Sequence, residues 1–505
     1  MQKILIAIFL VTVTITVDAQ KPQKPLPLKQ GTPFAQTITA ADLRKHLSIV
    51  ASAEMEGRET ATEGERKAAE YIEGVMRSVG LQPGFKGQYQ MPWPVYRDSV
   101  TSASLVINDQ PVAYNKDFTV SASNYTATQA FSNLVYVNFN DSLWRNNKVE
   151  VSGKLVLFRF NAPETGSGRG AFGNSPMLRV MQLMAKGAIA ALMVSDNLRA
   201  TNPLGGMTVT RYPSRQMINT FTISNAAASQ LLGAAKAAEE QAGKLMSGPI
   251  DANVVMNYTE TTQQLQSRNV LGLLPGTDKA DEYVVITAHH DHIGRQGDKI
   301  NYGADDDGSG TVSVLELAEA FAKAKAAGKG PRRSILFMTV GGEEKGLWGS
   351  AYYGDHPAYP LDKTSANLNI DMIGRIDSLY DKTDTSQYVY VVGDDKLSSD
   401  LPGIVKTANA FTKLHLDPKY NDPKDPMRIY FRSDHYNFAR KGVPVLFFFD
   451  GLHKDYHQPT DTFDKIEYEL MAKRAQLVFY TAWEMANRNY MLKRDIPLPA
   501  AALGR

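Results

Sequence analysis

The chain has 505 residues, enough for two or three domains, since a single hydrophobic core usually stops growing at roughly 250 to 300 residues. Lys and Arg (55) nearly balance Asp and Glu (53), and the formal net charge is +2, so nucleic acid is not an expected ligand. The sequence contains no cysteine, which excludes disulfides, thiolate metal ligands and a cysteine nucleophile. Any metal ion must be held by His, Asp and Glu.

The first 19 residues have the pattern of a secretory signal peptide. Met1 to Lys3 give a basic start, residues 4–17 form an apolar run, and Ala19 is a small residue suited to cleavage. A membrane anchor is the alternative, but the run is shorter than the roughly 20 residues of a spanning helix. We therefore expect export to the periplasm or the extracellular space, without a stable membrane anchor.

Residues 20–36 are rich in Pro, Lys and Gln and are predicted to form a leader. Two helices follow. The first begins after Thr39 and has Leu43, Leu47 and Val50 on one face, and the second ends near Gly80. They are expected to open a larger domain whose sheet comes later in the chain.

From residue 99 to residue 262 the sequence changes to short β-rich runs, with a strand, helix, strand pattern in the middle. Three runs stand out, namely Val151 to Leu157, Ala185 to Leu192 and Thr220 to Ser224. In these runs the segment resembles a protease-associated domain. The resemblance implies an inserted domain that carries no catalytic residues, while an unrelated β-rich insert is the alternative.

From residue 263 to residue 492, apolar strands alternate with longer helical patterns. The predicted class is α/β, with a mostly parallel mixed sheet and helices on both faces. The predicted buried strands are Val284 to Ala288, Ile335 to Val340, Leu368 to Ile373 and Val443 to Phe449, and the main helices are Thr311 to Ala324 and Glu467 to Ala486.

These patterns predict a main domain that is split by an insert. The expected segments are 1–19 (signal peptide), 20–36 (leader), 37–98 (first part of the main domain), 99–262 (insert), 263–492 (rest of the main domain) and 493–505 (tail).

Metal-competent side chains follow the predicted strands of the main domain. They are His289 and Asp291 after the first strand, Asp305 to Asp307 in the next loop, Glu343 and Glu344 after the second strand, Asp371 at the third, and His457 after the fourth. Ligands of open α/β sheets bind outside the carboxyl ends of the strands, so these groups can converge. Each alone is typical of a solvated loop or a helix cap, but their joint occurrence predicts a divalent metal site.

In this order the motifs resemble those of the family-28 metallopeptidases of clan MH, the di-zinc aminopeptidases with a zinc-exopeptidase, phosphorylase/hydrolase-like fold. The resemblance implies that His289 and Asp371 bind one Zn²⁺, that Glu344 and His457 bind the other, and that Asp306 bridges the two. Cobalt or manganese could occupy the same ligands.

The resemblance also assigns the catalytic residues. Glu343 is expected to act as the general base on a metal-bridging water, and Asp291 to orient His289. Asp305, Asp307 and the other histidines are expected to form loop structure or the wall of the site, and Asp461 and Thr462 to cap a helix.

The expected function is a secreted zinc exopeptidase, most simply an aminopeptidase acting on peptides with a free N-terminus. Carboxypeptidase or dipeptidase activity is an alternative, because Arg295, Arg375 or Arg432 could bind a terminal carboxylate. Glutaminyl cyclase and a non-catalytic, receptor-like binding protein are further alternatives, but neither needs the full set of ligands and the glutamate pair. The sequence does not fix the oligomeric state.

Overall fold

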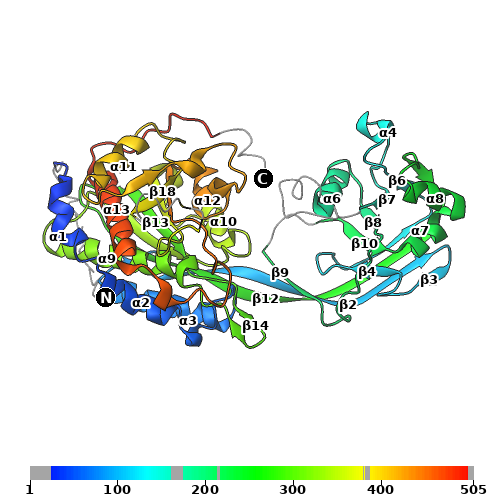
Figure 1. Cartoon of the computed structure of the whole chain (residues 1–505), viewed down its shortest axis with the longest axis horizontal. Coiled ribbons are helices and arrows are strands. Elements are labelled where there is room, and N and C mark those ends of the chain that lie inside the picture. Colours follow the sequence, from blue (N-terminus) through cyan, green and yellow to red (C-terminus); the bar gives the residue numbers. More distant parts are fainter. Residues whose placement is uncertain (1–23, 161–174, 213–216, 379, 381–386, 499–505) are drawn as a thin grey trace, which may run out of the picture. The chain divides into compact units, whose positions relative to one another are not determined.

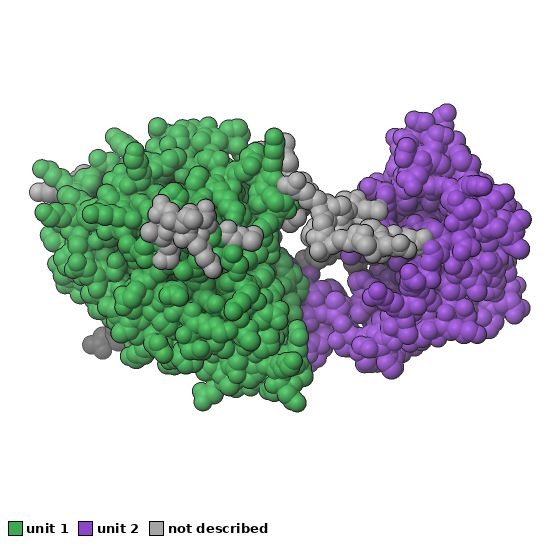
Figure 2. All heavy atoms as spheres, in the orientation of Figure 1, with its two compact units in different colours: residues 1–92, 268–505 green, residues 93–267 purple. Residues whose placement is uncertain are grey.

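The computed structural model describes residues 24–160, 175–212, 217–378, 380 and 387–498. The chain forms two compact units, unit 1 (Met1–Pro92 and Arg268–Arg505) and unit 2 (Trp93–Ser267), which are coloured separately in Figure 2. The predicted signal peptide, residues 1–19, lies outside the described residues. Within those residues, no helix combines the length and the apolar character needed to cross a membrane.

Unit 1 contains a mixed sheet with helices packed around it (Figure 1). Its helices are α1 (Thr32–Ala35), α2 (Ala40–Val50), α3 (Glu63–Ser78), α9 (Gly310–Ala326), α10 (Trp348–Asp355), α11 (Leu401–Asn409), α12 (His435–Ala439) and α13 (Tyr468–Asn487). Its strands are β1 (Gln82–Pro83), β13 (Lys279–His289), β14 (Arg295–Gln296), β15 (Lys299–Ile300), β16 (Arg333–Val340), β17 (Thr364–Ile370), β18 (Tyr388–Val392), β19 (His415–Asp417) and β20 (Val445–Phe449), joined by the last part of β12 (Val254–Leu274).

The strands of this sheet follow the order β19-β18-β20-β17-β13-β16-β12. The four central strands β20, β17, β13 and β16 are parallel to one another. On the outside, β18 pairs antiparallel with β20, and β12 pairs antiparallel with β16. All four predicted buried strands are therefore the centre of the sheet, and the predicted α/β class is confirmed. β17 ends at Ile370 rather than Ile373, because the chain turns into a loop at Asp371.

Alternate residues of the central strands pack on opposite faces of the sheet, as the period of a strand requires. Val284 and Ile286 of β13 contact the core formed with α9 and α13, whereas Val285 belongs to the core formed with α10 and α12. Because both faces are covered, these strands are apolar throughout rather than alternating.

The two predicted N-terminal helices are present as α2 and α3. The side chain of Thr39 caps α2 by accepting a hydrogen bond from the backbone of Asp42. The segment expected to be a leader differs from the prediction, because Leu28–Gly31 and α1 are helical. The ring of Phe34 stacks on Trp483 of α13 at 6.2 Å, so apolar residues in a polar segment hold it on the core.

Unit 2 has its own sheet, with the strand order β11-β6-β7-β8-β10-β4. Its elements are β3 (Gln110–Val112), β4 (Phe118–Val120), β5 (Ala127–Phe131), β6 (Leu134–Tyr136), β7 (Leu155–Arg159), β8 (Ala190–Val194), β9 (Thr208–Arg211), β10 (Asn219–Ile223), β11 (Gly248–Ile250), α4 (Ser142–Arg145), α6 (Pro176–Ala185), α7 (Asn225–Leu232) and α8 (Ala234–Gln241), with most of β2 (Gln90–Ile107). The expected strand, helix, strand order is present as β7, α6 and β8. The unit is somewhat wider than the predicted insert 99–262, since β2 and β12 continue through both of its ends.

Arg58 ties the N-terminal helices of unit 1 to the loops that follow the sheet. Its side chain is fully buried and donates hydrogen bonds of 2.8 Å to the backbone carbonyls of Val50, His290, Tyr302 and Gly303. The carbonyl of Gly303 also accepts a hydrogen bond from the backbone of Gly308 at 3.1 Å. A buried carbonyl that loses its donor costs about 1–3 kcal/mol.

We expect Arg58→Met to lower the free energy of unfolding of the protein by about 3 kcal/mol, because the new side chain fills the space but donates nothing. Urea denaturation followed by circular dichroism measures this change. Arg66→Met is the matched control, since the side chain of Arg66 is 40% exposed and pairs with Glu63 and Glu70 of its own helix, where solvent screens the charges. Equal denaturation midpoints for the two variants would contradict the role of Arg58.

Candidate metal centre

Polar side chains gather where the central parallel strands of unit 1 end. His289 is the last residue of β13, and Glu343 and Glu344 come shortly after β16. Asp371 directly follows β17, and His457 lies in the loop after β20. Because parallel strands end at one edge of the sheet, residues far apart in the sequence meet there.

His289, Asp306 and Asp371 form one group of possible metal ligands. Nε2 of His289 lies 3.3 Å from Oδ1 of Asp306 and 3.6 Å from Oδ1 of Asp371. All three residues are buried. The family resemblance implied that His289 and Asp371 bind one ion and that Asp306 bridges it to a second, and the structure brings these three residues together.

The second oxygen of Asp306 faces a second group. Nε2 of His457 lies 3.0 Å from Oδ2 of Asp306 and 3.1 Å from Oε2 of Glu344. The carboxylate of Asp306 therefore stands between two histidines, with one oxygen toward each. A carboxylate shared in this way can bridge two metal ions.

The geometry of both groups fits a metal ion such as zinc. Two ligands at about 2.1 Å from a zinc ion, at a tetrahedral angle, lie about 3.4 Å from each other. The nitrogen-to-oxygen distances in the two groups range from 3.0 to 3.6 Å. Oδ2 of Asp306, Oε1 of Glu344 and Nε2 of His457 are buried, and their near neighbours are imidazole and carboxylate atoms of the same cluster, out of regular hydrogen-bond geometry. Such atoms are costly unless a cation compensates them.

The pKa values of this cluster shift in the direction that a cation site requires. Burial alone would lower the pKa of His457, but the carboxylates of Asp306 and Glu344 outweigh it and raise this pKa to about 10. Burial disfavours the ionised form of Asp306, yet the imidazoles of His289 and His457 hold its pKa well below the usual value. Positive charge on the histidines thus balances the acids, a role that a divalent cation would take over.

The aspartates on either side of Asp306 hold the backbone of the loops. Asp307 accepts hydrogen bonds from the backbone of His289 (3.0 Å), Gly310 (2.9 Å) and Met372 (3.1 Å). Asp305 accepts one from the backbone of Gly374 at 2.7 Å. These are the loop roles expected for the two residues, and they join the loop after β13 to the loop after β17.

The expectation that Asp461 caps a helix is wrong. Its Oδ2 accepts hydrogen bonds from the backbone N–H groups of Asp305 (3.0 Å) and Asp306 (3.2 Å). Asp461 therefore supports the loop that carries the shared carboxylate. Its position just before Phe463 resembles a cap in the sequence, because nothing local shows that the side chain turns toward a loop more than 150 residues earlier.

Asp291 contacts both His289 and Glu343, but not quite as expected. Nδ1 of His289 is 3.1 Å from the backbone oxygen of Asp291 and 3.7 Å from its carboxylate. The carboxylate accepts hydrogen bonds from the backbone of Glu343 (3.1 Å) and the hydroxyl of Thr60 (2.8 Å). Asp291 thus orients His289 through its main chain and fixes the start of the Glu343 loop through its side chain.

Glu343 lies beside the first group, with Oε2 3.9 Å from Nε2 of His289. Burial raises its pKa well above the usual value; His289 opposes this shift, and the charges of Asp371 and Glu344 reinforce it. A carboxylate with a raised pKa accepts a proton more readily at neutral pH, which suits a general base.

His292 has a closer contact with the second group than the sequence indicated. Its Nδ1 lies 2.7 Å from Oε1 of Glu344 and 3.9 Å from Oδ2 of Asp306. The motif from His289 to His292 indicated that a histidine faces the carboxylates of the site, but the spacing alone did not show which histidine it is. His290 is buried against Thr339 and His453 contacts Asp305, so these two histidines support the site from outside.

Ser433 and Asp434 support the site from the segment before α12. The hydroxyl of Ser433 donates to Oδ2 of Asp371 at 2.6 Å and accepts a hydrogen bond from the side chain of Asn369 at 2.8 Å. Asp434 is fully buried, and burial raises its pKa to about 7. Ser433 therefore holds Asp371 from the side away from His289.

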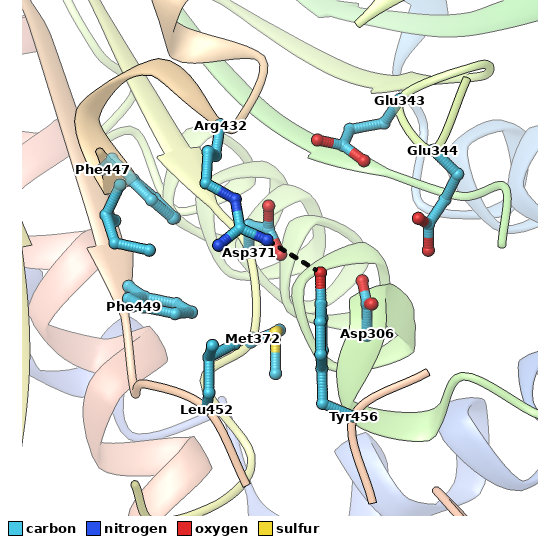
Figure 3. A pocket seen from close by; sticks show the side chains of 11 residues that line it. Asp306, Glu343, Glu344, Asp371, Met372, Arg432, Phe447, Phe449, Leu452 and Tyr456 are labelled. Carbon is cyan, nitrogen blue, oxygen red and sulfur yellow. Dashed lines mark hydrogen bonds between the residues drawn. The ribbon is translucent and has the colours of Figure 1, made fainter. Parts of the chain in front are cut away.

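A small apolar hollow of about 40 Å³ adjoins the metal-ligand residues (Figure 3). Its apolar lining consists of Met372, Ile429, Phe447, Phe449 and Leu452. Asp306, Glu343, Glu344, Asp371, Arg432 and Tyr456 complete the lining. The sequence analysis missed the apolar residues, because a continuous apolar strand does not reveal which of its side chains reach a ligand.

The three arginines that could bind a terminal carboxylate differ in their surroundings. Arg375 is paired with Asp455 at 3.0 Å, and Arg295 is exposed in the short strand β14. Arg432 lies at the hollow, where Nη2 is 3.3 Å from the hydroxyl of Tyr456 (Figure 3). Of the three, only Arg432 lies beside the candidate metal ligands.

The fold and the site define a class, namely α/β proteins whose sheet edge carries two ligand groups that share one carboxylate. Residues 269–482 match the model of peptidase family M28. All five candidate metal ligands lie within the matched region.

The chain is also similar to curated proteins and to a solved structure. The chain is 32% identical over 231 residues to a probable leucine aminopeptidase of Arthroderma otae, covering 44% of this chain and 58% of that protein. It is 27% identical over 256 residues to aminopeptidase YwaD of Bacillus subtilis, covering 47% of this chain and 50% of that protein. The chain thus spans little more than half the length of these relatives. The solved aminopeptidase from Aneurinibacillus sp. strain AM-1 shares the fold, with a TM-score of 0.56 and 20% identity over 93% of this chain and 98% of that chain.

We expect Ser433→Ala to weaken the binding of one divalent ion by about tenfold, because Asp371 loses the hydrogen bond that orients it. Zinc competition with a fluorescent chelator measures the two affinities separately. Ser313→Ala is the matched control, since Ser313 is also buried but donates to the backbone of Ser309 within α9. The same loss of affinity in both variants would contradict the role of Ser433.

Proposed function

We propose that the protein is a zinc-dependent aminopeptidase that removes N-terminal residues from peptides. The observation that carries this proposal is the carboxylate of Asp306, which presents one oxygen to His289 and the other to His457. The names of the similar curated proteins and the match of residues 269–482 to the model of peptidase family M28 support it.

Two zinc ions would be held by the five residues of the two ligand groups. His289 and Asp371 would hold one ion, His457 and Glu344 the other, and Asp306 would contact both. When bound, the ions supply Lewis acidity for the scissile carbonyl and acidify a water molecule.

Glu343 supplies the proton transfer. It would accept a proton from the attacking water and donate it to the leaving amine as the peptide bond breaks. Asp291 fixes the backbone of Glu343 through its 3.1 Å hydrogen bond, which keeps the base at the edge of the first ligand group. Proton transfer of this kind requires a base held within reach of the reacting atoms.

The hollow beside the site would receive the side chain of the N-terminal residue. Its apolar lining favours an apolar side chain, since burying each CH₂ group contributes about 0.8 kcal/mol. The carboxylates of Glu343 and Asp371 at the same hollow would attract the cationic α-amine of the substrate.

The remaining segments complete the proposal. Residues 1–19 would direct export, so the enzyme would act outside the cytoplasm. Unit 2 would be a protease-associated domain that carries none of the catalytic residues. Each of the residues given a catalytic or metal-binding role belongs to unit 1.

Hydrolysis of paired peptides tests the aminopeptidase activity. We expect the zinc-loaded protein to release the first residue of Leu-Ala-Ala-amide, and to lose at least about 99% of this rate when the α-amine is acetylated, because the blocked amine is uncharged. Liquid chromatography of the products measures both rates, and metal analysis by mass spectrometry gives the zinc content. Equal rates for the free and the acetylated peptide would contradict the proposal.

Glu343→Gln tests the base. The variant should retain both zinc ions and lose activity by about 10³-fold or more, since an amide cannot accept the proton. Glu344→Gln is the comparison, because its carboxylate is a proposed ligand and its loss should lower the zinc content as well as the rate. Near wild-type activity of Glu343→Gln at full zinc content would show that another residue is the base.

A further inference from the structure

A second cavity shares Glu343 with the apolar hollow. It has a volume of about 460 Å³, compared with about 40 Å³ for the apolar hollow. Both are lined by Glu343, Glu344, Arg432 and Tyr456, so the two cavities adjoin at these residues. The larger cavity extends past these shared residues to Asn437 and Arg440 of the segment that includes α12.

The two cavities differ in what they can hold. A peptide continues in only one direction from its N-terminal residue, so the small hollow suits the single side chain before the scissile bond. The larger cavity suits the residue after that bond and the chain that follows. Because Glu343 would pass a proton to the leaving amine, the leaving residue must lie beside it, where the larger cavity begins.

Arg432 and Arg440 give the larger cavity a positive character. Both side chains are exposed, and in the part of the chain that the structure describes their hydrogen bonds go to neutral groups. Arg432 donates to the hydroxyl of Tyr456 at 3.3 Å, and Nη1 of Arg440 lies 3.4 Å from Oδ1 of Asn437. Asn437 is itself held by hydrogen bonds to Leu347 (3.0 Å) and Ser350 (2.9 Å). These neutral contacts hold the guanidinium groups at the cavity without neutralising their charge.

We propose that Arg432 and Arg440 bind a carboxylate on the residue that follows the scissile bond. This inference rests on the proposed aminopeptidase function and adds the substrate class. A planar guanidinium binds a carboxylate through two parallel hydrogen bonds, which makes arginine the residue best suited to this group. The carboxylate can be an acidic side chain at the second position or the terminal carboxylate of a dipeptide.

Matched peptides distinguish these two sources. Leu-Glu-amide and Leu-Gln-amide differ only in a side-chain carboxylate, whereas Leu-Ala and Leu-Ala-amide differ only in a terminal carboxylate. We expect kcat/KM of the zinc-loaded protein to be about fivefold higher for the charged member of at least one pair, as an exposed ion pair allows. The pair that shows the preference identifies the source.

The ratio within each pair also tests the two arginines. Arg432→Gln and Arg440→Gln should each bring the preferred ratio toward one, and the ratio should fall with added salt because exposed charges are screened. Arg295→Gln is the matched control, since Arg295 is exposed in β14 and lines neither cavity. It should leave the ratio unchanged.

Ratios near one in both pairs, with normal hydrolysis of the amides, would overturn the inference and leave the aminopeptidase function intact. A preference that survives both arginine substitutions would also overturn it. Failure to cleave any of the four peptides at full zinc content would instead contradict the aminopeptidase function itself.

Discussion

The structure of unit 1 depends on the compensation of buried negative charge at one edge of its sheet. Asp306, Glu344 and Asp371 approach one another because their strands and loops end at the same place. Carboxylates brought this close repel each other and lose their hydration. Two imidazoles lie between them, and two divalent ions would compensate them further. The positions of a few strand ends therefore give this edge of the sheet a strong preference for binding cations.

The supporting residues are as specific as the ligands. Asp307 and Asp461 accept backbone hydrogen bonds, Ser433 binds the outer oxygen of Asp371, and Arg58 donates to carbonyls of the loop before Asp306. Each contact joins segments that are distant in the sequence. The metal-ligand atoms are thus fixed mainly by polar contacts behind them, which is what a site with little tolerance for displacement requires.

The central strands and the order of the polar groups could be predicted from the sequence, because apolar runs and the residues at their ends are local features. His289 and the pair Glu343 and Glu344 were recognised as candidates in this way, whereas the choice of Asp306 and Glu344 as ligands came from the family resemblance. The partners of Asp461 and the contacts of Arg58 with the loop after β13 could not be predicted, since they join segments more than 150 residues apart. Phe447 and Phe449 were hidden for another reason. They alternate with Leu446 and Phe448 in one apolar run, and only the two packed faces of the sheet decide which pair reaches the hollow.

The contacts of Arg58 have a consequence for how the domain is divided along the chain. A fragment of residues 268–498 would contain every proposed ligand and the proposed base, yet it would lack the donor that holds the carbonyls of His290, Tyr302 and Gly303. The N-terminal helices are therefore part of the smallest folding unit that can build the site. Residues 93–267 interrupt that unit, so its two parts can pack together only after the insert has been synthesised. The site therefore forms late in folding, when the first and last segments of the chain pack together.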